Sequence, residues 1–224
     1  PEQYGREGSA EQALERIAPV SRELHRVLAD TGSVWMEYGD EVTSTGPKFL
    51  DVEAARAFAA AAPWVLTQRC VRVTTNPKPC SGAGPMIPAT SSIFLFSKAG
   101  QKPYFDPLGL DGQAGRETIR SRIREGWDDD EAANTPTRAW NVFFVPRTCH
   151  HAHPHPAPFS PKLPEAWIRL SCPQGGTVLD PFSGSGSTGM AALALGRSFV
   201  GIDIQVDYLD LAISNLESVV PPAR

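Results

Sequence analysis

The sequence predicts an α/β protein built on a doubly wound, Rossmann-like sheet with permuted strand order. Three observations support this prediction. Segments with helical periodicity alternate with short apolar segments, an arrangement typical of a sheet with helices on both faces. A glycine-rich turn joins a predicted strand to a predicted helix, as in nucleotide-binding sheets. Because this turn lies in the C-terminal third of the chain, most of the sheet must come from residues upstream of it.

Local patterns predict each element in turn. Apolar residues recur every three or four positions over 10–28, and again from residue 50 until Pro63 ends the run, which predicts two helices. Short apolar runs bounded by turn residues predict strands at 33–38, 65–75, 91–98 and 138–146. A short helix at 165–172 precedes a strand, turn, helix and strand within 178–204, and a helix at 206–219 follows.

Composition sets the broad class of the protein. A chain of 224 residues with 41% hydrophobic and 21% charged residues is typical of one globular domain with a real core. No apolar run approaches the roughly 20 residues needed to span a bilayer, and nothing resembles a signal peptide. The four cysteines form no C-x-x-C pair, so we expect reduced thiols in a cytoplasmic protein. The net charge of −4 does not exclude a local basic patch that binds DNA.

The glycine turn from Gly184 to Gly189 fits G-x-G-x-x-G, and Asp203 follows the next strand. This pattern alone permits an NAD or FAD site. However, Asp180 lies at the tip of the preceding strand, where its charge would repel a pyrophosphate and favour a cation. S-adenosylmethionine carries an ammonium group, and it also offers ribose hydroxyls to Asp203. The position of the turn, late in the chain, further favours this methyl donor over a dinucleotide.

Several segments resemble the amino-group DNA methyltransferases of the permuted β group. "VLDPFSGSGSTG", "ALGRSFVGIDI" and "DYLDLAISNLE" resemble the cofactor half of that family, and "HPAPFSPKLPEAWIRL" resembles the segment before its glycine turn. The resemblance implies a Rossmann-like methyltransferase sheet and S-adenosyl-L-methionine as cofactor. The residues that it assigns to the cofactor, together with those argued above, are Asp180, Pro181, Phe182, Ser183, Gly184, Ser185, Gly186, Ser187, Thr188, Asp203, Ile204, His155, Phe159 and Lys162.

The resemblance also divides the chain into three parts. Residues 1–106 correspond to the catalytic half of the methyltransferase domain, with its first strands missing, and 139–224 to the cofactor-binding half of the same domain. Between them, 107–138 is polar, charged and weakly periodic, and is interpreted as a target-recognition segment or a mobile insertion.

One feature of the family does not occur in this sequence. Its catalytic tetrapeptide, a Ser, Asp or Asn followed by Pro-Pro and an aromatic residue, should lie just before "YGREGSAEQ". That motif holds the hydrogens of the target amino group, so that the lone pair faces the sulfonium methyl, and stacks the flipped base. Pro1 is interpreted as a remnant of the Pro-Pro pair. The two alternatives are a truncated sequence and a homologue that binds cofactor without transferring methyl.

Two charged or metal-binding patterns have competing explanations. The basic side chains of Arg120, Arg122 and Arg124 suit DNA phosphates, but four acidic residues follow at 128–131, so a solvated face is an equal alternative. Lys78 is a further candidate for nucleic-acid binding. A Cys and four His crowd 149–155, but their spacing does not match a closed zinc site, and no metal is expected.

These observations predict a site-specific DNA methyltransferase that acts on an exocyclic amino group of a flipped base in double-stranded DNA. Cytosine N4 is slightly preferred as target because of "HPAPFSPKLP", with adenine N6 as the alternative. A methyltransferase for RNA or small molecules, a non-catalytic cofactor- or DNA-binding homologue and a dinucleotide oxidoreductase remain competitors. The prediction is compatible with DNA methylation in a restriction-modification system with a partner endonuclease. No membrane partner is expected, and the oligomeric state is not predicted.

Overall fold

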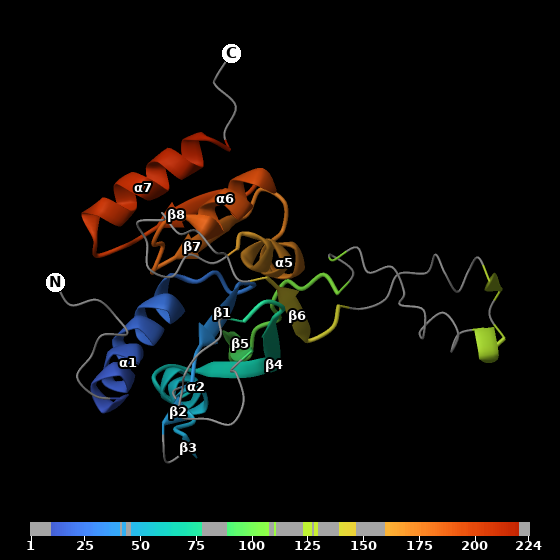
Figure 1. The fold of residues 1–224 in the computed structure, drawn as a ribbon, viewed down its shortest axis with the longest axis horizontal. Helices are drawn as coiled ribbons and strands as arrows, with labels where there is room; N and C mark the ends of the chain where they lie inside the picture. Colours follow the sequence, from blue (N-terminus) through green and yellow to red (C-terminus); the bar gives the residue numbers. More distant parts are fainter. Residues whose placement is uncertain are drawn as a thin grey trace.

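The computed structural model describes residues 10–40, 42–43, 46–77, 89–107, 110, 123–126, 128–129, 139–146 and 160–219 (Figure 1). The main elements of this part of the chain are five helices and eight strands. The helices are α1 (Ala10–Val27), α2 (Leu50–Ala60), α5 (Lys162–Ser171), α6 (Ser187–Ala194) and α7 (Val206–Glu217). The strands are β1 (Ser33–Tyr38), β2 (Val42–Thr43), β3 (Gly46–Pro47), β4 (Trp64–Thr74), β5 (Thr90–Lys98), β6 (Val142–Val145), β7 (Thr177–Asp180) and β8 (Ser198–Gly201).

The larger sheet has four strands in the order β1-β5-β4-β6. Strand β5 is antiparallel to both β1 and β4, whereas β4 and β6 are parallel. Strands β1, β4 and β6 therefore point the same way, and their carboxyl ends lie at one edge. Strands β7 and β8 form a separate parallel pair. The sequence predicts one sheet, but within the described residues no hydrogen-bonded ladder joins the two.

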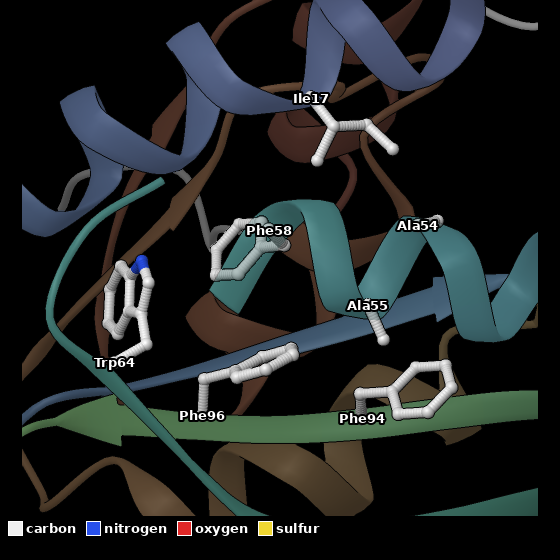
Figure 2. Packing of buried hydrophobic residues seen from close by; sticks show 7 residues of the cluster. All are labelled: Ile17, Ala54, Ala55, Phe58, Trp64, Phe94 and Phe96. Atoms are coloured by element: carbon white, nitrogen blue, oxygen red, sulfur yellow. The ribbon is translucent and has the colours of Figure 1, made fainter. Parts of the chain in front are cut away.

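One face of the larger sheet is covered by α1 and α2. Phe94 and Phe96 of β5 point to this face, and Phe96 meets Phe58 of α2, with their ring centroids 4.8 Å apart (Figure 2). Ala55 of α2 points toward the same phenylalanines, and its small side chain lets the helix approach the strand closely, whereas Ala54 points away from them (Figure 2). The buried members of this cluster are Ile17, Ala54, Ala55, Phe58, Trp64, Phe94 and Phe96.

Helix α5 covers the opposite face. The indole ring of Trp167 in α5 stacks on that of Trp35 in β1, with ring centroids 5.4 Å apart and an angle of 1° between the ring planes. The Trp35 Nε1 donates a hydrogen bond of 2.8 Å to Ser171 Oγ at the end of α5. The buried residues below α5 include Cys70, whose thiol pKa burial raises to about 11. Helices thus lie on both faces of the sheet, as the sequence predicts.

The boundaries differ from the predicted ones mainly at α5. This helix begins at Lys162, three residues before the predicted start, and includes Pro164 in its first turn. Proline is tolerated there because the first N–H groups of a helix have no partner within the helix. Most of 107–138, predicted to recognise the target, lies outside the described residues. In the part of the chain that is described, none of the helices is both long and apolar enough to cross a bilayer.

The contact between α1 and the rest of the core depends on Ser21. Its side chain is fully buried, and Oγ donates to the carbonyl of Phe58 at 2.7 Å and accepts Trp64 Nε1–H at 2.8 Å. We expect Ser21→Ala to lower the free energy of unfolding by about 1–3 kcal/mol, because a buried indole N–H loses its acceptor. Urea unfolding would measure this, with the exposed Ser214→Ala as control. A loss below about 0.5 kcal/mol would contradict the assigned role.

Candidate functional site

The predicted glycine turn connects β7 to α6 and has the backbone that only glycine adopts readily. Gly184 has φ of 49° and Gly186 has φ of 82°, both in the left-handed region. A Cβ atom at Gly186 would also lie 3.1 Å from the Cβ of Ala212 in α7. The turn therefore needs glycine both for its backbone and for its close approach to α7.

Asp180 ends β7 and faces into this turn. Its Oδ1 accepts the Phe182 N–H at 3.0 Å. Burial raises the pKa of the Asp180 carboxyl above its usual value, and the charge of nearby Asp203 adds to this rise. Hydrogen bonds from Thr188 and Phe182 oppose the rise in part. An ionised Asp180 is thus incompletely compensated by the protein, and a cationic ligand would supply the missing counter-charge.

Asp203 follows β8, and its two carboxylate oxygens bind backbone N–H groups. Oδ2 accepts Gly184 N–H at 2.8 Å, and Oδ1 accepts Gln205 N–H at 2.9 Å. The sequence predicts that Asp203 binds ribose hydroxyls, and the structure adds a second task, because the residue ties the turn to the segment after β8. Each carboxylate oxygen can accept a further hydrogen bond.

Two further bonds hold the turn. The Ser183 N–H donates to the Ile202 carbonyl at 2.9 Å, and Nδ2 of Asn215 in α7 donates to the Ser185 carbonyl at 2.9 Å. The contact of Asn215 was not predicted from the sequence, because nothing near an amide in an amphipathic helix indicates a hydrogen-bond partner 30 residues away. The serines at 183, 185 and 187 are buried and complete the packed floor of the turn.

The rim of the turn is apolar and open. Phe182 is 50% exposed and Ile204 is 63% exposed, although both are large hydrophobic residues. Both adjoin the two acidic positions along the chain, since Phe182 follows Asp180 by two residues and Ile204 follows Asp203. The site thus combines carboxylates, glycine backbone and exposed apolar side chains, as a ligand with a flat ring and a cationic end requires.

The remaining predicted site residues are only partly placed. Lys162 is the exposed first residue of α5, and Arg124 is exposed in the short described segment 123–126. The predicted residues that lie outside the described residues are Pro1, Lys78, Arg120, Arg122, His155 and Phe159, and the Cys and His residues of 149–155 lie there too.

A family model described as DNA methylase, for N6 and N4 methyltransferases, matches residues 1–214. The chain belongs to this family of DNA methylases. The methylase is therefore an amino-group DNA methyltransferase of the restriction-modification type, and this assignment disfavours the dinucleotide oxidoreductase and the non-catalytic homologue. Whether the amino group is cytosine N4 or adenine N6 is not decided by the family, which includes both.

Curated relatives match the methylase over most of its length. The Type II methyltransferase M.Cfr9I of Citrobacter freundii is 29% identical over 242 residues, which cover 96% of the chain and 75% of the relative. The Type II methyltransferase M.SmaI of Serratia marcescens is 26% identical over 242 residues, which cover 94% of the chain and 76% of the relative.

Solved structures show the fold of the methylase. The PvuII cytosine-N4-specific DNA methyltransferase superimposes with a TM-score of 0.73 at 14% identity. The match covers 100% of the methylase chain and 78% of the PvuII chain. The M1.HpyAVI complex with SAM gives a TM-score of 0.64 at 19% identity, over 94% and 84% of the two chains. The predicted fold class, a Rossmann-like methyltransferase sheet, is thereby confirmed.

Proposed function

We propose that the methylase binds S-adenosyl-L-methionine at the glycine turn and methylates N4 of cytosine in double-stranded DNA. The observation that carries the cofactor assignment is the carboxylate of Asp180, whose raised pKa and position beside an apolar rim match a ligand with a cationic end. When bound, the cofactor supplies an electrophilic methyl group on a positively charged sulfur. The residues of the turn orient it and do not react.

Each part of the site has a task in this proposal. Asp180 receives the ammonium group of the cofactor, and the free acceptor positions of Asp203 receive the ribose hydroxyls. Phe182 and Ile204 offer apolar contacts to the adenine ring, because at least half of each residue is exposed beside the carboxylates. His155, Phe159 and Lys162, which the family resemblance assigns to the amino-acid end of the cofactor, complete the proposed set.

DNA contacts are proposed for Arg120, Arg122, Arg124 and Lys78. Arginine and lysine neutralise phosphates and displace counter-ions, so their effect on binding should depend on salt. The target base must leave the helix before its amino group can reach the methyl donor, because the reacting atoms must line up. Residues 107–138 are proposed to recognise the target sequence, and a restriction endonuclease with the same specificity is the proposed biological partner.

The preference for cytosine rests on "HPAPFSPKLP" and predicts a specific product. Full-length methylase incubated with mixed-sequence DNA and methyl-labelled S-adenosylmethionine should give N4-methylcytosine after digestion to nucleosides and mass analysis. Parallel reactions with RNA of the same sequence should give no label. N6-methyladenine as the product would overturn the cytosine assignment alone, and label in RNA would overturn the DNA substrate.

A further inference from the structure

The C-terminal helix α7 packs against the rear of the glycine turn. The closest approach is at Gly186, where a Cβ would lie 3.1 Å from Ala212. One helical turn further along, Asn215 reaches the turn with its side-chain amide and donates to the Ser185 carbonyl at 2.9 Å. Asn215 is partly buried, so this hydrogen bond is shielded from competition with water.

The bond to Asn215 fixes one peptide unit of the turn on both sides. The Ser185 carbonyl accepts from Asn215, and the N–H of Gly186, on the same peptide plane, donates to the Ser183 carbonyl at 2.9 Å. The plane therefore cannot rotate without breaking a hydrogen bond at each end. This matters because Gly186, with φ of 82°, has the conformational freedom to adopt several other backbone geometries.

The neighbouring peptide, between Gly184 and Ser185, is bonded differently. Phe182, Ser183, Gly184 and Gly186 all donate their N–H groups within the protein. By contrast, the Ser185 N–H has no acceptor among the residues that the structure describes. Asn215 thus fixes the peptide plane that directly follows the unused Ser185 N–H, and the two planes share the Cα of Ser185. A backbone donor whose neighbouring peptide is fixed beforehand loses less conformational freedom when a ligand binds.

We propose that Asn215 is a positioning residue for cofactor binding: it holds the Ser185 carbonyl and thereby sets the backbone that receives S-adenosylmethionine. This inference rests on the proposed function of the turn. Asn215 does not touch the cofactor in this account and acts only through Ser185. Its loss should therefore weaken cofactor binding and leave the methyl-transfer step and the DNA interaction almost unchanged.

The test compares three substitutions at this position. Asn215→Asp keeps the size of the side chain but places an oxygen where the donor stood, so it opposes the Ser185 carbonyl. Asn215→Leu removes the hydrogen bond and keeps the same branched shape and number of heavy atoms in the side chain. Asn215→Gln retains the amide donor on a longer side chain and serves as the conservative rescue. Ser214→Ala, on the exposed side of the same helix, is the matched control.

We expect Asn215→Asp and Asn215→Leu to raise the Kd and KM for S-adenosylmethionine about five- to tenfold, measured by calorimetry and by initial rates. The kcat at saturating cofactor and the KM for DNA should change by less than about twofold. Asn215→Gln should recover at least half of the lost affinity on a logarithmic scale, and Ser214→Ala should match the wild type.

Three outcomes would overturn the inference. Variants that melt at lower temperature but bind the cofactor with unchanged Kd would show that Asn215 has a structural role only. A fall in kcat with unchanged KM would place its effect on the chemical step. If Asn215→Gln does not recover affinity, the loss of cofactor binding in the other variants does not come from loss of the amide donor. If the wild type itself does not bind S-adenosylmethionine, the proposed function of the turn fails together with the inference. If the wild type binds and only the expected effects of the Asn215 variants are missing, the inference alone fails.

Discussion

Replacing Asp180 by Asn is expected to weaken binding of S-adenosylmethionine about a hundredfold, which corresponds to about 2.8 kcal/mol. The substitution keeps an oxygen that can accept the Phe182 N–H, so the turn should persist. What it removes is the negative charge opposite the ammonium group of the cofactor. Calorimetric titration would measure the loss, with Asp210→Asn, an exposed acidic residue of α7, as the control.

The same substitution should not destabilise the free protein. Because burial raises the pKa of Asp180 when the chain folds, the ionised form costs stability at neutral pH. Protonation removes this cost, so the free protein gains stability from this group as the pH falls through the raised pKa and loses it as the pH rises. Asn is uncharged at every pH, and the melting temperature of Asp180→Asn without cofactor should therefore equal or exceed that of the wild type. A clear drop in melting temperature would contradict this account.

Cofactor binding should depend on pH in the opposite sense. A cationic group beside Asp180 favours its ionised form and lowers its pKa, so binding releases a proton in the window between the free and bound pKa values. Affinity should therefore fall as the pH drops through the raised pKa of free Asp180, by up to about tenfold per pH unit. In Asp180→Asn this part of the pH dependence should disappear, and its persistence would assign the dependence to another group.

Phe96→Ala should cause the largest loss of stability, about 3–5 kcal/mol. Phe96 is fully buried on the central strand β5, and its ring packs against Phe58, Phe94 and Trp64. Removal leaves a cavity under α2 that the neighbouring alanines are too small to fill. Since a domain is typically stable by only about 5–15 kcal/mol, the loss is a large share of the total.

Urea unfolding followed by tryptophan fluorescence would measure this loss, because Trp64 lies in the same cluster. Phe144→Ala is the matched control, since Phe144 is 63% exposed on the edge strand β6. The control should cost less than about 1 kcal/mol. Similar losses for the two substitutions would mean that the cluster between α1, α2 and β5 is not the main core.

Local patterns in the sequence predict most elements of the methylase but not how the strands pair. Strand 33–38 and helix 206–219 are found close to their predicted limits, because alternation and helical periodicity record which side of each element is buried. By contrast, nothing in 91–98 indicates that β5 inserts antiparallel between β1 and β4, since pairing depends on residues distant in the chain.

The cofactor turn shows the same limit on a smaller scale. Its glycines and Asp180 are predictable because the backbone geometry and the charge restrict the residue type. The backbone-binding role of Asp203 and the contact of Asn215 are not predictable, because they depend on how β8 and α7 return to the turn. The assignment of 107–138 and of the residues contributed by the segment before α5 remains a prediction.

The bonds that shape the turn are all made between Asp180 and Asn215, within one uninterrupted stretch of chain. Among the described residues, none of the hydrogen bonds that shape the turn involves α1, α2 or the larger sheet. The turn would therefore keep these hydrogen bonds whether its stretch of chain stood ahead of or behind the catalytic segments. The contacts of the turn therefore place no constraint on the order in which the catalytic and cofactor-binding halves follow one another along a chain.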